Sequence, residues 1–250
     1  MLKETQFRLL SDPSLDGAVN MARDEALMVQ VGRGESPPTL RLYQWNEPTI
    51  SLGYFQPFAQ YEALPAPYNA LAVVRRMTGG GAILHDLELT YSITVHAGHP
   101  LVSAGANRLY EIAHDVVIAA LAELGVDAAR CGASDDSGAA RGPFYCFARR
   151  HCYDVVVGAD KIAGSAQRRT RAAVLQHGSV VLANRFSDQP TATVPMPFEE
   201  AIARMRAAFP DQFARVRGLG FEPGEWTGDE LNAGRELAGK YAGVAWTRRT

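Results

Sequence analysis

The chain has 250 residues, of which 47% are hydrophobic and 21% are charged, and its formal net charge is −2. This balance is typical of a folded globular protein and excludes intrinsic disorder and fibrous repeats. Its three cysteines form no CxxC pair and follow no secretory leader, so we expect a reducing, cytoplasmic compartment. The longest clear apolar run, residues 116–122, is too short to cross a membrane, and no membrane partner is expected.

The first half of the chain predicts a helix followed by short strands. Asp16 is a candidate N-cap for a helix over residues 18–30, with Gly32 after its end. Residues 40–45 and 49–55 are rich in β-branched and aromatic side chains and are separated by an Asn-Glu-Pro turn, which predicts two paired strands. Further strands are expected at residues 71–76, 82–86 and 89–95.

The middle of the chain predicts a helix, a loop and a hairpin. The helix over residues 107–124 should end at Gly125, and the small, polar residues 128–145 predict a mobile loop. Residues 153–157 and 161–167 predict a hairpin, beside which residues 173–182 add a strand.

The C-terminal segment predicts two helices, at residues 198–209 and 229–242, and a Thr227…Glu230 capping box opens the second. Together the elements predict an α+β fold with a mainly antiparallel sheet flanked by helices. We expect residues 1–186 to form the main domain and residues 187–250 a helical C-terminal extension.

A glycine loop between two apolar strands is a candidate binding element. Glycine allows backbone N–H groups to face a ligand closely, so the loop could hold a carbonyl or phosphate, or it could be a loose hairpin connection. Arg75 and Arg76 before it and His85 after it favour a polar site, although two arginines on a strand are often a solvated edge. The loop residues are Thr78, Gly79, Gly80 and Gly81.

The strand that starts at Lys161 is a second candidate. Alternation predicts that residues 161, 163, 165 and 167 share a face, which would place Lys161 beside Ala163 and Ser165 and leave room for a ligand. Gly164 indicates close approach of a ligand or backbone, and we include Gly164, Ser165 and Ala166 among the candidate substrate-binding residues. A surface lysine near a hairpin turn is the alternative.

Cys146 is the candidate nucleophile. Arg149, Arg150 and His151 follow it closely, and positive charge favours the thiolate, which is the reactive form. The alternative is a small core residue. Cys152 is a competitor, but its position at the start of a strand predicts burial. Cys131 lies in the predicted loop.

Other charged and histidine residues give weaker signals. Residues 141–171 carry a net charge of +5, which leaves about −7 for the rest, so this segment could steer an acidic partner or be a solvated loop. Its arginines interleave poorly with aromatic residues, so no nucleic-acid partner is expected. His96, His99 and His114 lack metal-ligand spacing, and no metal site is expected.

Four ordered blocks resemble the lipoate–protein ligase and octanoyltransferase family, which is related to the biotin ligase catalytic domain. The resemblance covers most of residues 15–185 and implies a biotin/lipoate ligase-like catalytic domain over residues 1–186. KYAGVAW near the C-terminus also resembles a family motif. The four blocks are NMARDEAL, LRLYQWNEPTISLGYFQ, RRMTGGGAILHDLELTYS and DKIAGSAQRR…LQHGSVVL.

The resemblance also implies residue roles. The equivalents of Arg76, the glycine loop and His85 line the acyl pocket in this family, and the equivalent of Lys161 contacts the acyl carbonyl. The Cys146-Phe147 pair before a Tyr-acid-hydrophobic strand resembles the cysteine-dependent octanoyltransferases typical of Gram-positive bacteria. Cys152 stands where that pattern has an aromatic residue, so both thiols stay candidates.

The implied reaction moves octanoate from octanoyl-acyl carrier protein, through a cysteine thioester, to a lysine of a lipoyl domain or of the glycine-cleavage H protein. It needs no cofactor. One alternative is a lipoate–protein ligase that uses ATP and Mg²⁺ to form an acyl-adenylate. The other is a non-catalytic acyl-binding protein that retains the pocket.

Overall fold

The structure is a computed structural model that describes residues 6–132 and 143–249. Its strands are β1 (Gln6–Leu15), β2 (Thr39–Trp45), β3 (Thr49–Leu52), β4 (Ala72–Arg75), β5 (Ile83–His85), β6 (Glu88–His96), β7 (Ala129–Arg130), β8 (Val155–Val157), β9 (Asp160–Arg169), β10 (Ala173–Val181) and β11 (Gly220–Pro223). Its α-helices are α1 (Gly17–Arg33), α2 (Ala59–Glu62), α3 (Pro100–Ser103), α4 (Arg108–Glu123), α5 (Phe198–Arg217), α6 (Gly228–Ala242) and α7 (Val244–Thr247). Two short 3₁₀ helices are η1 (Tyr68–Ala70) and η2 (Cys146–Ala148).

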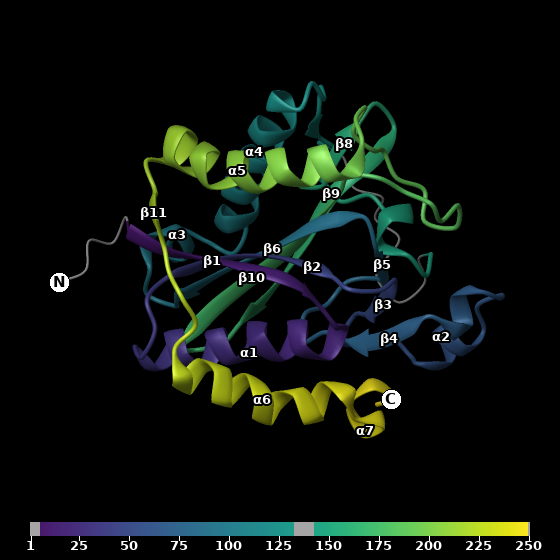
Figure 1. The fold of residues 1–250 in the computed structure, drawn as a ribbon, viewed down its shortest axis with the longest axis horizontal. Coiled ribbons are helices and arrows are strands. Elements are labelled where there is room, and N and C mark those ends of the chain that lie inside the picture. The colour runs from purple at the N-terminus through teal and green to yellow at the C-terminus, as the bar shows by residue number, and fades with distance from the viewer. Residues whose placement is uncertain (1–5, 133–142, 250) are drawn as a thin grey trace.

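The described residues form two sheets, and helices lie on both sides of the larger one (Figure 1). The larger sheet has the strand order β11-β1-β2-β6-β10-β9-β8-β7, and the smaller has the order β4-β3-β5. Most neighbouring strands are antiparallel, whereas β1 is parallel to β2 and β11, and β3 is parallel to β4. The expected α+β fold with a mainly antiparallel sheet is confirmed.

Capping residues fix the helix ends. The Asp16 side chain accepts a hydrogen bond from the Val19 N–H at 2.9 Å, and Thr227 with Glu230 forms the expected capping box. The predicted end of the first helix is wrong, because α1 runs through Gly32 to a left-handed cap at Gly34. Gly32 serves close packing instead, since a Cβ there would lie 3.0 Å from the Cβ of Ala172.

The expected pairing of residues 40–45 with residues 49–55 is also wrong. β2 lies between β1 and β6 in the larger sheet, whereas β3 lies between β4 and β5 in the smaller one. The sequence did not predict β1, because Pro13 interrupts its strand pattern; a register shift between Ser11 and Ser14 accommodates this proline. The glycine loop is not a hairpin connection either, since β4 and β5 pair with opposite edges of β3.

The predicted hairpin is present as β8 and β9, and β10 follows beside β9 as expected. The predicted loop over residues 128–145 lies partly outside the described residues, which exclude 133–142. In the described part of this segment, Ala129 and Arg130 form β7, which pairs with β8. No helix in the described ranges is both long and apolar enough to cross a membrane.

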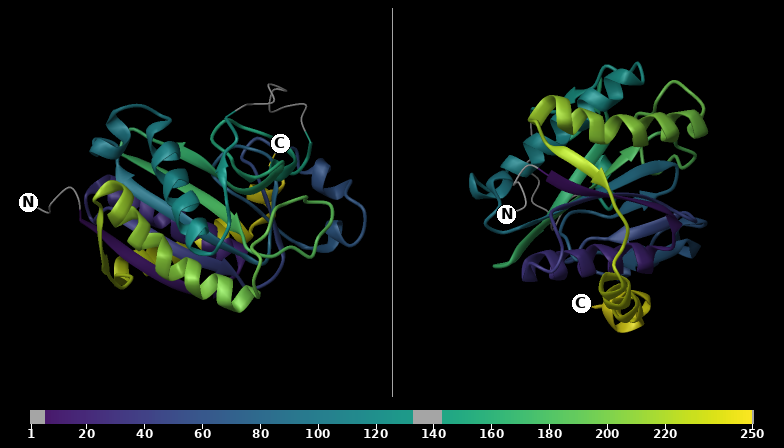
Figure 2. Two further views of the ribbon diagram at one scale, coloured as in Figure 1. Left: turned by 90° about the horizontal axis from the view of Figure 1, so that it is seen from above. Right: turned by 60° about the vertical axis from the view of Figure 1, so that its left-hand side comes forward.

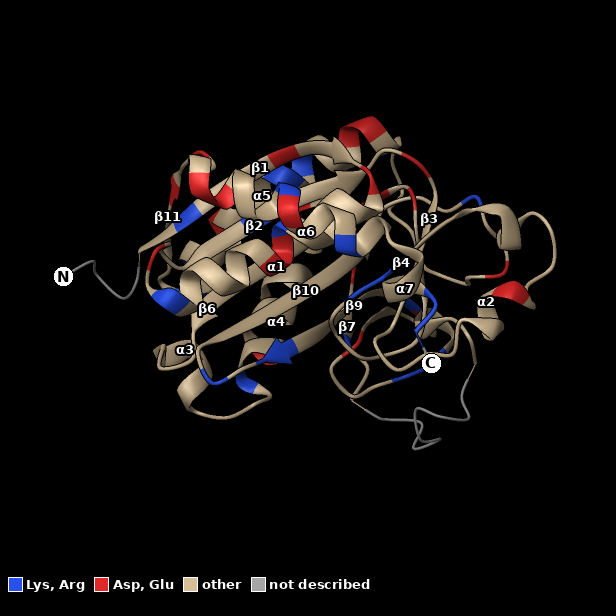
Figure 3. Cartoon of the chain, turned by 90° about the horizontal axis from the view of Figure 1, so that it is seen from below, with Lys and Arg blue, Asp and Glu red and all other residues tan. Residues whose placement is uncertain are grey.

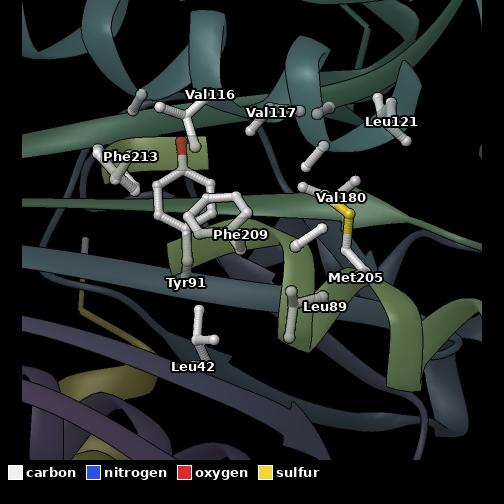
Figure 4. Packing of buried hydrophobic residues seen from close by; sticks show 14 of the residues in the cluster. Leu42, Leu89, Tyr91, Val116, Val117, Leu121, Val180, Met205, Phe209 and Phe213 are labelled. Atoms are coloured by element: carbon white, nitrogen blue, oxygen red, sulfur yellow. The ribbon is translucent and has the colours of Figure 1, made fainter. Parts of the chain in front are cut away.

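The main core lies between the larger sheet and helices α4 and α5 (Figure 4). Tyr91 of β6 meets Phe209 of α5 with ring centroids 4.9 Å apart, and Val116 of α4 belongs to the same cluster. Both α5 and β11 come from the segment after residue 187, so this segment contributes to the same core and sheet as the rest. The division into a main domain over residues 1–186 and a C-terminal extension over residues 187–250 stays a prediction.

The opposite side of the sheet is covered by α1, and α6 lies along the outer side of α1 (Figures 1 and 2). Met21 of α1, Tyr43 of β2 and Tyr241 of α6 form a smaller cluster there. Many sheet residues on this side are polar and buried, including Ser92 and His177. This side therefore has the room and the hydrogen-bonding groups for a site.

His114 of α4 predicts a pH-dependent stability. Its Nδ1–H donates to the Tyr153 carbonyl, and its Nε2 accepts from the Ser165 hydroxyl at 2.7 Å. Burial lowers the pKa of His114 from 6.5 to about 4, although the bond to Tyr153 opposes the shift. Because the folded state resists protonation, this group should remove about 3 kcal/mol of stability as the pH falls from 7 to 4.

Urea unfolding at pH 7 and at pH 4 should therefore show that the free energy of unfolding falls more in the native chain than in His114→Gln. The glutamine keeps polar atoms but does not titrate. Equal losses in the two proteins would contradict this assignment.

Candidate active site

A pocket lies between the α1 side of the larger sheet, the smaller sheet and η2. The cavity that it encloses is narrow, with a volume of about 40 Å³. Seven of the residues predicted from the sequence line it: Arg76, Gly80, His85, Cys146, Gly164, Ser165 and Ala166.

The register of the larger sheet explains which residues face the pocket. Residues directly opposite each other on neighbouring strands project from the same face. One such row crosses four strands through Tyr43, Thr90, Ser179 and Gly164. The next row crosses the same strands through Arg41, Ser92, His177 and Ala166.

A β-bulge brings Lys161 to this face. Ile162 is an extra residue between two successive pairs of the β8–β9 ladder, which reverses the alternation at that point. Ala163 therefore packs in the main core, while the Lys161 side chain lies over Gly164, where a Cβ would be 2.6 Å from Lys161 Cε. The predicted shared face of Lys161, Ala163 and Ser165 is wrong for this reason.

The Lys161 ammonium is buried and has three polar neighbours. Nζ lies 2.9 Å from Asp154 Oδ1, 3.4 Å from the Cys146 carbonyl oxygen and 3.7 Å from Cys146 Sγ. It also lies 5.0 Å from the centre of the Phe147 ring. The two residues predicted to be catalytic are thus in direct contact. Sequence reasoning counted Asp154 only as a charge, although its place in the Tyr-acid-hydrophobic strand was a usable signal.

The backbone around Cys146 is held against the end of the glycine loop. The Cys146 N–H donates to the Ala82 carbonyl at 2.7 Å, and the Ala82 N–H donates to the Phe144 carbonyl at 3.0 Å. Phe147 is fully buried in a cluster with Ile83, to which the half-buried Cys146 also packs. This anchoring turns the Cys146 side chain toward the pocket and Lys161.

The cation that contacts Cys146 and the burial of Cys152 both differ from what the sequence predicted. Arg149 donates to the Pro143 carbonyl and Arg150 to the Ala159 carbonyl, whereas Lys161 is the cation that contacts Cys146 Sγ. The predicted burial of Cys152 is wrong, because β8 begins only at Val155 and Cys152 lies in the preceding turn, half-buried like Cys146. Neither Cys152 nor Cys131 lines the pocket in the part of the chain that the structure describes.

The glycine loop encloses the guanidinium of Arg76. Arg76 donates to the carbonyls of Gly79 and Gly81, at 2.8 and 2.7 Å, and to Thr78 Oγ1 at 3.1 Å. Gly80 has φ +93°, and a Cβ there would lie 3.0 Å from Arg76 Nη2. Burial lowers the pKa of Arg76 to about 10, so the group stays charged at neutral pH. The loop therefore fixes a cation at the pocket wall.

His85 and Trp45 form another wall. His85 Nε2 lies 2.7 Å from Ser51 Oγ, and its Nδ1 lies 2.8 Å from Glu88 Oε1. The ring stacks on Trp45 with centroids 3.9 Å apart. Trp45 and Ser51 line the pocket too, but no signal in the sequence separates them from ordinary strand residues.

His177 joins the pocket to α1. Its Nδ1 lies 3.1 Å from Asp24 Oδ2, and its Nε2 lies 2.7 Å from Thr78 Oγ1. Burial lowers the pKa of His177 below its ordinary value, although Asp24 opposes this, so the imidazole is neutral at pH 7. Sequence reasoning missed both residues. A carboxylate on the first helix and a histidine inside an apolar strand were the available signals.

The pocket thus combines a thiol, an adjacent ammonium and aromatic or apolar surfaces from Trp45, Phe147 and Met21. A thiol beside an ammonium suits nucleophilic attack on a carbonyl, because the cation stabilises the thiolate and can exchange a proton with it. The apolar surfaces suit a hydrocarbon chain. Acyl transfer is the chemistry that uses both.

Comparison with known proteins agrees with this chemistry. Residues 16–210 match the model of the lipoyl protein ligase A/B catalytic domain. The octanoyltransferase LipM of Kyrpidia tusciae is 37% identical, with 97% of this chain and 98% of that protein covered, and the LipM of Moorella thermoacetica is 36% identical over the same shares.

A similar fold occurs in the solved structure of a bi-partite lipoate protein ligase and its E2 lipoyl domain from Thermoplasma acidophilum. The TM-score is 0.72 at 22% identity, with 98% of this chain and 96% of that chain covered. This likeness concerns the fold alone. The family match spans most of the chain and the relatives match along nearly all of it, so the chain belongs to the lipoyl protein ligase A/B catalytic domain family.

Proposed function

We propose that this chain transfers an octanoyl group from octanoyl-acyl carrier protein to a lysine of a lipoyl domain, through a thioester on Cys146. The contact of Lys161 Nζ with the Sγ of Cys146, which lines a partly apolar pocket, is the observation that carries the proposal. The octanoyltransferase relatives support the reaction class.

In the first half-reaction, the Cys146 thiolate attacks the thioester carbonyl of the donor. A carbon–sulfur bond forms at Cys146, and the bond to the carrier thiol breaks. Lys161 gives its proton to the departing thiolate, which leaves an acyl-enzyme with a neutral amine at Lys161. The Cys146 N–H is engaged by the Ala82 carbonyl, so the Lys161 ammonium is the donor we assign to the developing oxyanion.

In the second half-reaction, the amine of the acceptor lysine attacks the acyl-enzyme. An amide forms, the Cys146 thiolate leaves, and Lys161 takes the proton that the attacking amine loses. This restores the starting thiolate and ammonium. Because an amide replaces a thioester, the exchange is downhill and needs neither ATP nor a metal ion.

The other pocket residues are assigned to binding. The octanoyl chain would lie against Trp45, Met21 and Phe147, while Arg76 and His85 set the polar end of the wall. Asp154 is a positioning residue, because its carboxylate holds the Lys161 ammonium beside the sulfur. The acceptor is a lipoyl domain or the glycine-cleavage H protein. We place the reaction in the cytoplasm.

The role of Cys146 can be tested with two matched thiol variants. After mixing with octanoyl-acyl carrier protein, intact-mass spectrometry should show one added octanoyl group in the native chain and in Cys152→Ser. Cys146→Ser should show none, and its transfer rate should fall by at least about 10³-fold, because the serine hydroxyl is a far weaker nucleophile at neutral pH. Lipoylation that needs ATP and leaves no adduct would instead favour the ligase.

The role of Lys161 can be tested by Lys161→Ala, with Lys240→Ala as the control. Lys240 also pairs with a carboxylate, Glu25, but lies outside the pocket. We expect stopped-flow acylation of Cys146 to slow by about 10²-fold in Lys161→Ala, since the proton donor is lost. Added methylamine should restore part of the rate, and Lys240→Ala should react normally.

Lys161→Ala also leaves Asp154 buried without its cation, which should cost about 3–5 kcal/mol of stability. The double variant Lys161→Met/Asp154→Asn separates this effect from catalysis, because it should recover stability but not activity. If acylation in Lys161→Ala stays within about threefold of the native rate, the assignment of Lys161 is wrong.

A further inference from the structure

Arg75 ties the turn after β3 to the C-terminal tail. Its fully buried guanidinium donates to the carbonyls of Gly53 and Gln56, at 2.8 and 2.7 Å, and to that of Thr247 at 2.8 Å. The Trp246 indole N–H donates back to the Arg75 carbonyl at 2.8 Å. These bonds fix residues 53–56 beside residues 246–249.

A cluster of arginine and aromatic side chains, partly exposed and partly half-buried, lies on this frame. The Arg249 guanidinium lies 4.0 Å from the centre of the Tyr54 ring, and the Arg168 guanidinium lies 5.4 Å from it. Phe55 meets Tyr54 edge-on and is 82% exposed. We call these four residues the rim: Tyr54, Phe55, Arg168 and Arg249.

The rim borders the pocket. Arg168 follows Ala166 by two residues on β9, so both project from the same face of the strand, and Ala166 lines the pocket. The Tyr54 N–H donates to the Thr78 carbonyl at 2.8 Å. Gly53 passes so close to the pocket residue Gly80 that a Cβ would lie 2.0 Å from its carbonyl oxygen.

The charge of the rim is not neutralised within the described chain. Neither Arg168 nor Arg249 forms a salt bridge among residues 6–132 and 143–249. Stacking on an aromatic ring leaves guanidinium N–H groups able to bind carboxylates. Figure 3 shows basic segments around α7 and the chain end, whereas many acidic segments gather around α1, α5 and α6.

We infer that the rim is the docking surface for the acidic carrier protein that delivers the acyl group. The inference rests on the proposed function, because a carrier-bound thioester must be brought beside the pocket to reach Cys146. Exposed Arg168 and half-buried Arg249, next to exposed Phe55 and half-buried Tyr54, provide charge complementarity and apolar contact, which together are typical of protein interfaces. The rim takes Arg168 from the +5 segment but Arg249 from the distant C-terminus.

The test compares two donors with the full-length chain. One donor is octanoyl-acyl carrier protein, and the other is octanoyl-N-acetylcysteamine, a small uncharged thioester. For the double variant Arg168→Glu/Arg249→Glu, we expect kcat/KM for acylation of Cys146 to fall at least about tenfold with the carrier and to lose its salt dependence. With the small thioester, kcat/KM should change less than twofold.

Arg204→Glu/Arg215→Glu is the charge-matched control, because both arginines are exposed on α5, across the sheet from α1. It should react normally with both donors. An equal loss with both donors, or no loss with the carrier, would overturn the inference. The inference would also be overturned if the double variant slowed only the second half-reaction, in which preformed acyl-enzyme reacts with the lipoyl domain. The rim would then bind the acceptor.

Failure of the proposed function would look different, since then neither donor would acylate the native chain. The rim would still be tested in that case by the binding of a fluorescently labelled carrier protein, which the double variant should weaken at least about tenfold. Unchanged binding would overturn the inference.

Discussion

The buried ion pair between Lys161 and Asp154 sets the geometry of the whole site. An ammonium almost never enters a protein interior without a partner, since its desolvation costs several kcal/mol. Asp154 supplies that partner, and Gly164 supplies the space, because any side chain there would collide with Lys161. The remaining direction open to the ammonium is toward Cys146, whose carbonyl oxygen and sulfur both lie within contact distance.

The rest of the pocket repeats this use of buried polar groups held by short-range partners. Arg76 is enclosed by loop carbonyls, His177 lies between Asp24 and Thr78, and His85 lies between Glu88 and Ser51. Buried polar groups of this kind are stable only when they are hydrogen-bonded, and each bond fixes a side chain. An acyl group entering the pocket would therefore meet rigid walls, which favours positioning of the carbonyl against the sulfur.

The sequence predicted those features that depend on local chemistry. The N-caps Asp16 and Thr227, the αL glycine after α4 and the β8–β9 hairpin are set by residues within a few positions of one another. Cys146 was a candidate because of the cations that follow it and Lys161 because of strand alternation, and the resemblance to the family then implied their roles. Contact between them depends on one extra residue, Ile162, and alternation along the strand predicts the opposite face.

Features set by distant partners were not predictable in this way. β1 contains Pro13 and pairs along its length with β2 and β11, so its stability comes from neighbours that the local pattern does not reveal. Asp24 and His177 are 153 residues apart in the sequence, and they form a hydrogen bond only because α1 packs across the sheet. The same is true of the rim, where Arg168 and Arg249 meet on Tyr54.

A crystal structure of the chain after reaction with an octanoyl thioester tests the central claim most directly. We expect continuous electron density from Cys146 Sγ into the pocket beside Trp45, with the thioester oxygen within hydrogen-bond distance of Lys161 Nζ and Asp154 still bound to that ammonium. An octanoyl group attached to another residue, or a Cys146 adduct whose carbonyl lies away from Lys161, would contradict the account.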